Sequence, residues 1–217
     1  MLAMRYLLLF MLLNVYGFSS EVVCIHGFMR HQICMKHMAK KLRQSGHTPI
    51  IWGYKSRSKT IEEHSADLVA SLKKLEGNGP INFVTHSMGG LIVRAALNHP
   101  ACPQRAKEGA VIMLAPPNRG SAIARALKGV LLVEKAFGKK AGQQLLNYDQ
   151  THIQDLGTFP ATCSITCIAG SKDWKVKIEE TYLETEHTHH VIECGHTTIM
   201  KDPHAIKIVL AAISPSP

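Results

Sequence analysis

The residues best suited to chemistry surround Ser87. Residues 81–94 (INFVTHSMGGLIVR) begin as an apolar, β-branched run, pass through a short turn and continue with helical character. This order predicts a strand, a sharp turn and a helix, with Ser87 at the tip of the turn. Such a turn raises a serine hydroxyl above the C-terminal edge of a sheet, where it can attack a carbonyl carbon. Gly89 is expected to let the helix start close against the strand.

One residue of this turn departs from the usual pattern. The expected sequence is Gly-x-Ser-x-Gly, and Thr85 stands where the first glycine belongs. A Ser-x-Gly triplet alone is common, whereas HSMGG directly after an apolar strand is far more specific. The alternative is a tight turn with an idle serine, so the hypothesis depends on partners for Ser87.

A carboxylate and a base follow Ser87 in the order that this chemistry needs. Asp173 comes after a predicted strand at 163–169, and His196 comes after another at 189–193. In a parallel sheet both loops leave the same edge as the serine turn. A histidine can take the serine proton, and a carboxylate can fix its tautomer and stabilise its cation. We therefore predict Ser87 as nucleophile, His196 as general base and acid, and Asp173 as the orienting carboxylate.

Other acids and histidines compete for the last two roles. Asp149 and Asp155 fall between predicted strands, and Asp202 is better explained as the N-cap of a helix that begins at Pro203. His196 is preferred because it directly follows a strand and a glycine frees its turn. The chain has 13 histidines, most of which fit solvated or capping roles. The nearby ones set aside for this reason are His187, His189, His190 and His204.

The start of the chain supplies a fourth part of the site. Residues 21–25 (EVVCI) predict a strand, and His26, Gly27 and Phe28 follow it. A strand that ends in His-Gly-aromatic is typical of a loop that donates one backbone N–H to an oxyanion. The second donor is expected from Met88, the residue after the nucleophile. We predict the N–H groups of Phe28 and Met88 as an oxyanion hole, in which each donor contributes about 3–4 kcal/mol.

Strands and helices alternate along the chain. Strands are expected near 22–26, 49–53, 80–85, 109–114, 163–169 and 189–193, and helices near 31–45, 60–76, 88–98 and 203–213. A capping-box pattern at 60–63 begins the second helix. This alternation predicts an α/β fold with a mostly parallel sheet of about six strands and helices on both faces.

Taken together, these motifs resemble the α/β-hydrolase superfamily, and within it the small bacterial lipases and esterases. The matching segments are VCIHGF at 23–28, THSMGG at 85–90, LAPPNRGS at 114–121, GSKD at 170–173 and GHT at 195–197. The resemblance implies hydrolysis of carboxylic esters through an acyl-enzyme, without a metal or an organic cofactor. An acyltransferase that uses the same triad remains open, as does a non-catalytic binding protein on the same scaffold.

Residues 119–160 interrupt the alternation. Short helical candidates at 122–128, 130–137 and 142–147 are separated by glycines. The resemblance implies a small helical cap over the site here, and an ordinary surface connection is the alternative. A lid requires that the apolar residues of this segment face the site, namely Ile123, Leu127, Leu131, Leu132 and Phe137.

Residues 1–20 have the three-part build of a secretory signal peptide. Arg5 supplies the positive charge, an apolar block follows, and Gly17 and Ser19 suit a cleavage site. An uncleaved membrane anchor is the alternative, although the apolar block is short for a span. We therefore expect an exported protein, periplasmic or extracellular, with one hydrolase domain over residues 21–217.

Composition sets the outer limits. The chain is 46% hydrophobic and 19% charged, as in ordinary globular proteins. Its formal charge is +9, or +8 without Arg5, which is consistent with solubility and with transient contact with anionic lipid surfaces; acidic polymers are the alternative partner. The basic residues are scattered and no nucleic-acid motif occurs, so we expect no nucleic-acid partner. The oligomeric state is not indicated.

The six cysteines permit disulfides in an exported chain, but the sequence assigns no pairing. Cys24, Cys167 and Cys194 are expected inside buried strands, where free cysteine acts as a small apolar residue. Metal-site patterns such as Cys-x-x-Cys and His-Glu-x-x-His are missing from the sequence, so no metal is predicted.

Overall fold

The computed structural model describes residues 20–148 and 150–213, and its centre is one six-stranded sheet. The strands are β1 (Glu21–Ile25), β2 (Thr48–Trp52), β3 (Ile81–His86), β4 (Ala110–Leu114), β5 (Ser164–Gly170) and β6 (Thr188–Ile192). They lie in the order β2–β1–β3–β4–β5–β6, and each neighbouring pair is parallel. The predicted α/β architecture is therefore confirmed.

The strand order reverses beside β1, because the chain first moves outward to β2 and then returns to β3 on the other side. In α/β sheets this reversal opens a crevice at the carboxyl ends of the strands, where ligands bind. The loops that follow β1 and β3 flank that crevice. They are the two loops in which the sequence places the oxyanion donors and the nucleophile.

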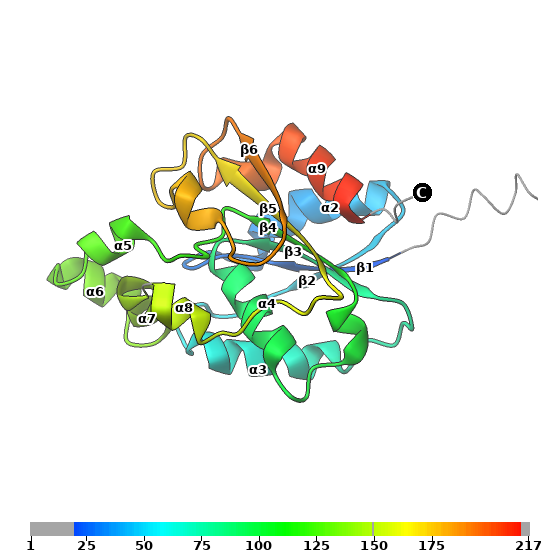
Figure 1. Cartoon of the computed structure of the whole chain (residues 1–217), viewed down its shortest axis with the longest axis horizontal. Helices are drawn as coiled ribbons and strands as arrows, with labels where there is room; N and C mark the ends of the chain where they lie inside the picture. Colours follow the sequence, from blue (N-terminus) through cyan, green and yellow to red (C-terminus); the bar gives the residue numbers. More distant parts are fainter. Residues whose placement is uncertain (1–19, 149, 214–217) are drawn as a thin grey trace, which may run out of the picture.

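Helices cover both faces of the sheet (Figure 1). The α-helices that build these layers are α2 (Lys36–Gln44), α3 (Ile61–Leu72), α4 (Met88–Asn98) and α9 (Pro203–Ile213). Helices α3 and α4 pack together on one face, and α2 and α9 pack on the other. Short 3-10 helices occur at Gln32–Met35, Gln104–Lys107, Ile178–Thr181 and Thr198–Lys201.

Each face of the sheet has its own apolar layer. Phe83 belongs to the layer under α3 and α4, while its neighbour Val84 belongs to the layer under α2 and α9. Successive side chains of a strand point to opposite faces, so a strand covered on both sides must be apolar throughout. This explains why every residue of β3 is buried.

Helix boundaries follow the local capping signals. The predicted capping box is confirmed, because Thr60 Oγ1 accepts from Glu63 N at 3.1 Å and Thr60 N donates to Glu63 Oε2 at 2.8 Å. Asp202 caps α9 as expected, and its Oδ1 accepts from His204 N at 2.8 Å. The helix predicted over 60–76 ends at Leu72.

Two further predicted elements need correction. The helix expected over 31–45 consists of a 3-10 turn, Gln32–Met35, and then α2. The expectation that Cys194 lies inside a strand is wrong, although Cys24 and Cys167 do lie in buried strands. Cys194 follows β6 in a tight turn that its own N–H closes on Ile192 O at 2.9 Å. All six cysteines are free thiols.

A group of four short helices joins β4 to β5 and projects beyond the carboxyl edge of the sheet (Figure 1). We call residues 119–160 the cap segment. Its helices are α5 (Ala122–Ala126), α6 (Leu131–Phe137), α7 (Ala141–Asn147) and α8 (Gln150–Gln154). The first three correspond to the predicted helical stretches, whereas α8 was not expected from the sequence.

The signal peptide expected from the sequence is the N-terminal segment, residues 1–20. Except for Ser20, that segment lies outside the described residues, as does Asp149 among the alternative acids. Within the described part of the chain, no helix is both long enough and apolar enough to span a bilayer.

Candidate active site

Ser87 occupies the sharp turn between β3 and α4. Its backbone has φ 51° and ψ −124°, in a region that costs a non-glycine residue about 1–3 kcal/mol. Two backbone hydrogen bonds hold the turn: Ser87 N donates to Leu114 O, and Gly90 N donates to Ser87 O, both at 2.9 Å. A Cβ on Gly89 would lie 3.0 Å from the carbonyl oxygens of Ile25 and His26. Gly89 therefore lets α4 start directly against the end of β1, as expected.

Thr85 stands in place of the usual first glycine, and its side chain fits because α4 has a glycine, Gly90, beside it. Its side chain is fully buried, and its Oγ1 lies 3.5 Å from Ile112 O. In the neighbouring helix α4, a Cβ on Gly90 would lie only 3.3 Å from Thr85 Oγ1 and 3.0 Å from Met113 Sδ. The glycine missing at position 85 is thus compensated by the glycine at position 90.

His196 and Asp173 form a short, buried ion-pair contact at this edge of the sheet. His196 Nδ1 donates to Asp173 Oδ2 at 2.6 Å. The other carboxylate oxygen, Oδ1, accepts from Lys175 N at 2.8 Å and Val176 N at 3.0 Å. Because Nδ1 carries the proton, Nε2 is left with its lone pair and can act as a base.

The environment keeps Asp173 ionised. Burial would raise the pKa of its carboxyl group, but the hydrogen bond and the charge of His196, with the two backbone donors, hold the pKa below its ordinary value. The rival acids are not placed for this role: Asp155 is exposed, and Asp202 caps α9.

Two side chains bond to His196 and its neighbour Thr197. His86 Nε2 donates to the carbonyl oxygen of His196 at 2.7 Å, and Arg30 Nη2 donates to Thr197 Oγ1 at 2.6 Å. Burial, followed by the nearby charge of protonated His196, lowers the pKa of His86 to about 3. His86 is therefore a neutral donor. The sequence reasoning missed this role, although the position of His86 directly before Ser87 was a signal.

The two expected oxyanion donors belong to segments that adjoin Ser87. Met88 is the first residue of α4, so its N–H has no acceptor within the helix. The N–H of Phe28 donates to no acceptor among the described residues. The loop of Phe28 also packs against the nucleophile, since a Cβ on Gly27 would lie 3.0 Å from Ser87 Cβ.

A cavity of about 280 Å³ connects these groups with the cap segment. Ser87 and His196 lie in its wall together with Phe28. Most of the remaining wall is apolar, and its larger side chains are Leu91, Ile123, Leu127, Phe137, Leu145, Ile153 and Trp174. Its size and its few polar groups suit a small apolar ligand.

The apolar residues of the cap segment divide into two groups. Ile123, Leu127 and Phe137 line the cavity, and the ring of Phe137 contacts that of Phe28 with centroids 5.0 Å apart. Leu131 and Leu132 are 78% and 79% exposed. Three of the five residues that a lid requires thus face the site, and two face solvent.

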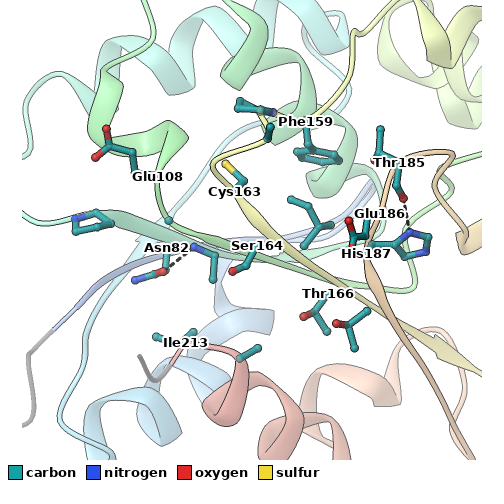
Figure 2. Close-up of a pocket in the computed structure, with 18 of the residues that line it drawn as sticks. Asn82, Glu108, Phe159, Cys163, Ser164, Thr166, Thr185, Glu186, His187 and Ile213 are labelled. Atoms are coloured by element: carbon teal, nitrogen blue, oxygen red, sulfur yellow. Dashed lines mark hydrogen bonds between the residues drawn. The ribbon is translucent and has the colours of Figure 1, made fainter. Parts of the chain in front are cut away.

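A larger cavity, of about 980 Å³, lies at the opposite edge of the sheet, where β3, β4 and β5 begin (Figure 2). Two of its polar side chains are bonded within the protein: Asn82 Oδ1 accepts from Ala110 N at 2.8 Å, and His187 Nδ1 donates to Thr185 O at 2.7 Å. Burial raises the pKa of the Cys163 thiol to about 11, which makes it a poor nucleophile at neutral pH. We therefore place the chemistry in the smaller cavity.

Two of the histidines set aside in the sequence, His187 and His189, have local partners. The His189 ring stacks on Tyr182 with centroids 3.8 Å apart, and its Nε2 lies 2.8 Å from Thr181 Oγ1. His187 contacts the same tyrosine edge-on. No group of three or more potential metal-binding side chains occurs within residues 20–148 and 150–213.

Known structures resemble this one closely in fold and weakly in sequence. The mature lipase BlEst2 of Bacillus licheniformis superposes with a TM-score of 0.75 and 17% identity, covering 90% of this chain and 92% of that one. The metagenomic carboxyl esterase MGS0156 superposes with a TM-score of 0.72 and 18% identity, covering 90% of this chain and 70% of that one. Mouse alpha/beta hydrolase domain-containing protein 10 superposes with a TM-score of 0.57 and 17% identity, covering 92% of this chain and 90% of that one. The chain therefore has the α/β-hydrolase fold.

Sequence comparison adds nothing to this assignment. No protein-family model matches the chain, and no curated protein matches it either. At 17–18% identity, the structural likeness defines the fold and leaves the activity to be argued from the site.

Proposed function

We propose that this protein is a serine hydrolase that cleaves carboxylic esters through an acyl-enzyme. Ser87 Oγ attacks the ester carbonyl carbon while His196 Nε2 takes its proton, and Asp173 stabilises the resulting imidazolium. The N–H groups of Phe28 and Met88 bind the oxyanion. His196 then protonates the leaving alcohol, and it later activates the water that releases the acid and restores Ser87.

One observation carries this proposal. Ser87 sits in a strained turn at the carboxyl edge of the sheet, in one cavity with a histidine whose other ring nitrogen is bound to a buried carboxylate at 2.6 Å. A strained backbone costs free energy, and a buried carboxylate with a shifted pKa beside a histidine is typical of functional sites, so their meeting at one cavity supports such a site. The lipase and esterase structures with the same fold are consistent with this chemistry.

The first experiment compares the wild type with Ser87→Ala on p-nitrophenyl esters of increasing acyl length. We expect the variant to lose at least 10³-fold in kcat/KM, because the nucleophile is removed. Its thermal midpoint should stay close to that of the wild type. Retained turnover in Ser87→Ala would overturn the nucleophile assignment. We also expect activity to favour apolar acyl groups that fit the 280 Å³ cavity.

We also propose that the mouth of this cavity makes transient contact with anionic lipid surfaces. Trp174 lines the cavity and is exposed, and Leu131 and Leu132 are exposed at the start of α6, the helix that ends at the cavity-lining Phe137. The exposed Lys128 and Lys135 belong to the same part of the cap segment, so positive charge accompanies the apolar surface. Apolar area and basic charge together are the features that bind peripheral proteins to anionic membranes.

Export of the protein is our remaining proposal. The composition of residues 1–20 supports removal of a signal peptide. N-terminal sequencing of protein recovered outside the cytoplasm should then find a chain that begins near Glu21. A full-length chain recovered with membranes would favour the uncleaved anchor instead.

A further inference from the structure

The loop between β2 and α3 braces the oxyanion loop from outside the cavity. We call residues 53–60 the brace loop and residues 26–30 the oxyanion loop. The two are far apart in sequence, and two hydrogen bonds join them. Ser56 Oγ accepts from Met29 N at 2.9 Å, and Tyr54 Oη donates to His26 O at 2.8 Å.

Both contacts are partly buried, and in each the accepting residue lies inside the protein. Ser56 is only 6% exposed, and His26 is fully buried. The Tyr54 ring stacks on the His26 ring with centroids 4.3 Å apart and 16° between their planes, and it also contacts the rings of Trp52 and His64. A hydrogen bond in such a setting is costly to lose, because the buried partner is left unsatisfied.

The oxyanion loop needs external support because its own turn is strained. Met29 has φ 52°, which non-glycine residues rarely adopt. The hydrogen bond that closes this turn, from Arg30 N to Gly27 O, is long at 3.3 Å. The contact from Ser56 therefore helps to hold Met29 in this conformation.

The two bonds fix the backbone on both sides of the proposed donor. Tyr54 holds the carbonyl of His26, and Ser56 holds the N–H of Met29. Between them lies the N–H of Phe28, which remains free for a ligand. Oxyanion donors act through preorganisation, so small changes in their direction reduce transition-state stabilisation.

The brace loop is itself anchored to the cap segment. Arg57 Nη2 donates to Lys135 O at 3.1 Å, and Ala141 N donates to Lys59 O at 3.0 Å. These contacts hold the loop at its far end, so Ser56 and Tyr54 act from a fixed support.

We propose that Ser56 and Tyr54 are positioning residues that aim the N–H of Phe28 at the substrate oxyanion. The inference rests on the proposed ester hydrolysis and names residues outside the triad and the oxyanion hole. Its key test is Ser56→Ala, with Ser58→Ala as the matched control. Ser58 lies in the same loop, but its hydroxyl is exposed and donates only to Lys55 O at 2.8 Å.

For Ser56→Ala we expect kcat on a p-nitrophenyl ester to fall about 10-fold, with KM within about twofold. Removal of a whole oxyanion donor costs about 10²–10³-fold, and a loosened donor should lose part of that. A trifluoromethyl ketone, whose adduct on Ser87 carries an oxyanion, should bind Ser56→Ala about 10-fold more weakly. Ser58→Ala should match the wild type in all three measurements. Tyr54→Phe, which keeps the ring and loses the hydroxyl, should show the same pattern with a smaller loss.

Active-site titration separates positioning from misfolding. If the loss in Ser56→Ala equals its loss of titratable sites, or if Ser58→Ala loses as much, the inference is wrong. An unchanged kcat in both Ser56→Ala and Tyr54→Phe would also overturn it. A wild-type protein without Ser87-dependent turnover would instead refute the proposed function itself.

Discussion

Ser87 and His86 are adjacent in sequence and contribute in different ways to the site. The backbone of Ser87 is strained at a positive φ, whereas the buried, neutral His86 ring donates a hydrogen bond to the carbonyl of His196. Neither feature improves stability, since the first stores strain and the second keeps a titratable ring away from water. Their cost is understandable if the two residues place a nucleophile and its base at one cavity.

Asp173→Asn should lower kcat strongly with little change in fold. An amide at this position cannot both accept from His196 Nδ1 and keep the present backbone contacts, so the histidine loses its fixed tautomer. We expect kcat at pH 7 to fall about 10³–10⁴-fold, measured on a p-nitrophenyl ester. A loss below about 10-fold would show that another acid serves His196.

His86 should make the protein sensitive to acid. The unfolded histidine titrates near pH 6.5, and the folded one near 3, so only the unfolded state takes up this proton between those values. Stability is therefore lost as the pH falls through that window, by about 2 kcal/mol at pH 5. His86→Gln cannot titrate but can still donate to His196 O.

Urea unfolding of both proteins at pH 7 and pH 5 measures this contribution. The wild type should lose about 2 kcal/mol more than His86→Gln between the two pH values. Other buried histidines, such as His26 and His64, affect both proteins and cancel in the comparison. An equal pH dependence would contradict the neutral state of His86.

At the scale of the elements, the loops that carry Ser87, Asp173 and His196 follow β3, β5 and β6 and meet at one edge of the sheet. The alternation of strands and helices predicted the sheet from sequence because buried parallel strands have continuous apolar runs. Capping residues such as Thr60 and Asp202 also marked helix starts correctly. Helix ends were less predictable, because α3 ends at Leu72 before any glycine.

The brace loop shows what local patterns could not predict. Its contact with the oxyanion loop joins Ser56 to Met29, which are 27 residues apart, through a single hydroxyl. Serine in a polar loop carries no periodic signal, so only the folded arrangement reveals its partner. In the sequence this loop shows scattered basic residues such as Lys55 and Arg57, which gave no reason to connect the two loops.

The packing of β3 against α4 gives a test at the element scale. Gly90→Ala should crowd Thr85 and destabilise the protein by about 1–3 kcal/mol. In a Thr85→Gly background the same change should cost less, because the facing hydroxyl is gone. Urea unfolding of the wild type, Gly90→Ala, Thr85→Gly and the double variant gives the coupling free energy between the two positions, which we expect to be at least about 0.5 kcal/mol. Strictly additive effects would show that Gly90 does not compensate for Thr85.

At the scale of the whole molecule, positive charge and exposed apolar side chains occur together in the cap segment. The formal charge of +9 should draw the protein to anionic vesicles. We expect Ser87→Ala, used to avoid hydrolysis, to co-sediment with phosphatidylcholine vesicles containing phosphatidylglycerol more than with phosphatidylcholine alone. Replacing both Leu131 and Leu132 by Asp should weaken binding at least 5-fold.

Val191→Asp is the matched control for this experiment, because Val191 is an exposed apolar residue on the edge strand β6, away from the cap segment. It should leave vesicle binding unchanged. Equal binding by the Leu131/Leu132 variant and the wild type would refute the proposed lipid-contact surface without bearing on catalysis.

The central claim is that Ser87 is a nucleophile activated by His196. The most direct measurement is intact-mass and peptide analysis after treatment with a fluorophosphonate probe. The account predicts one adduct per chain, located on Ser87, with no adduct on Ser87→Ala and slow labelling of His196→Ala. A folded wild-type protein that takes no label, or takes it on another residue, would contradict the account.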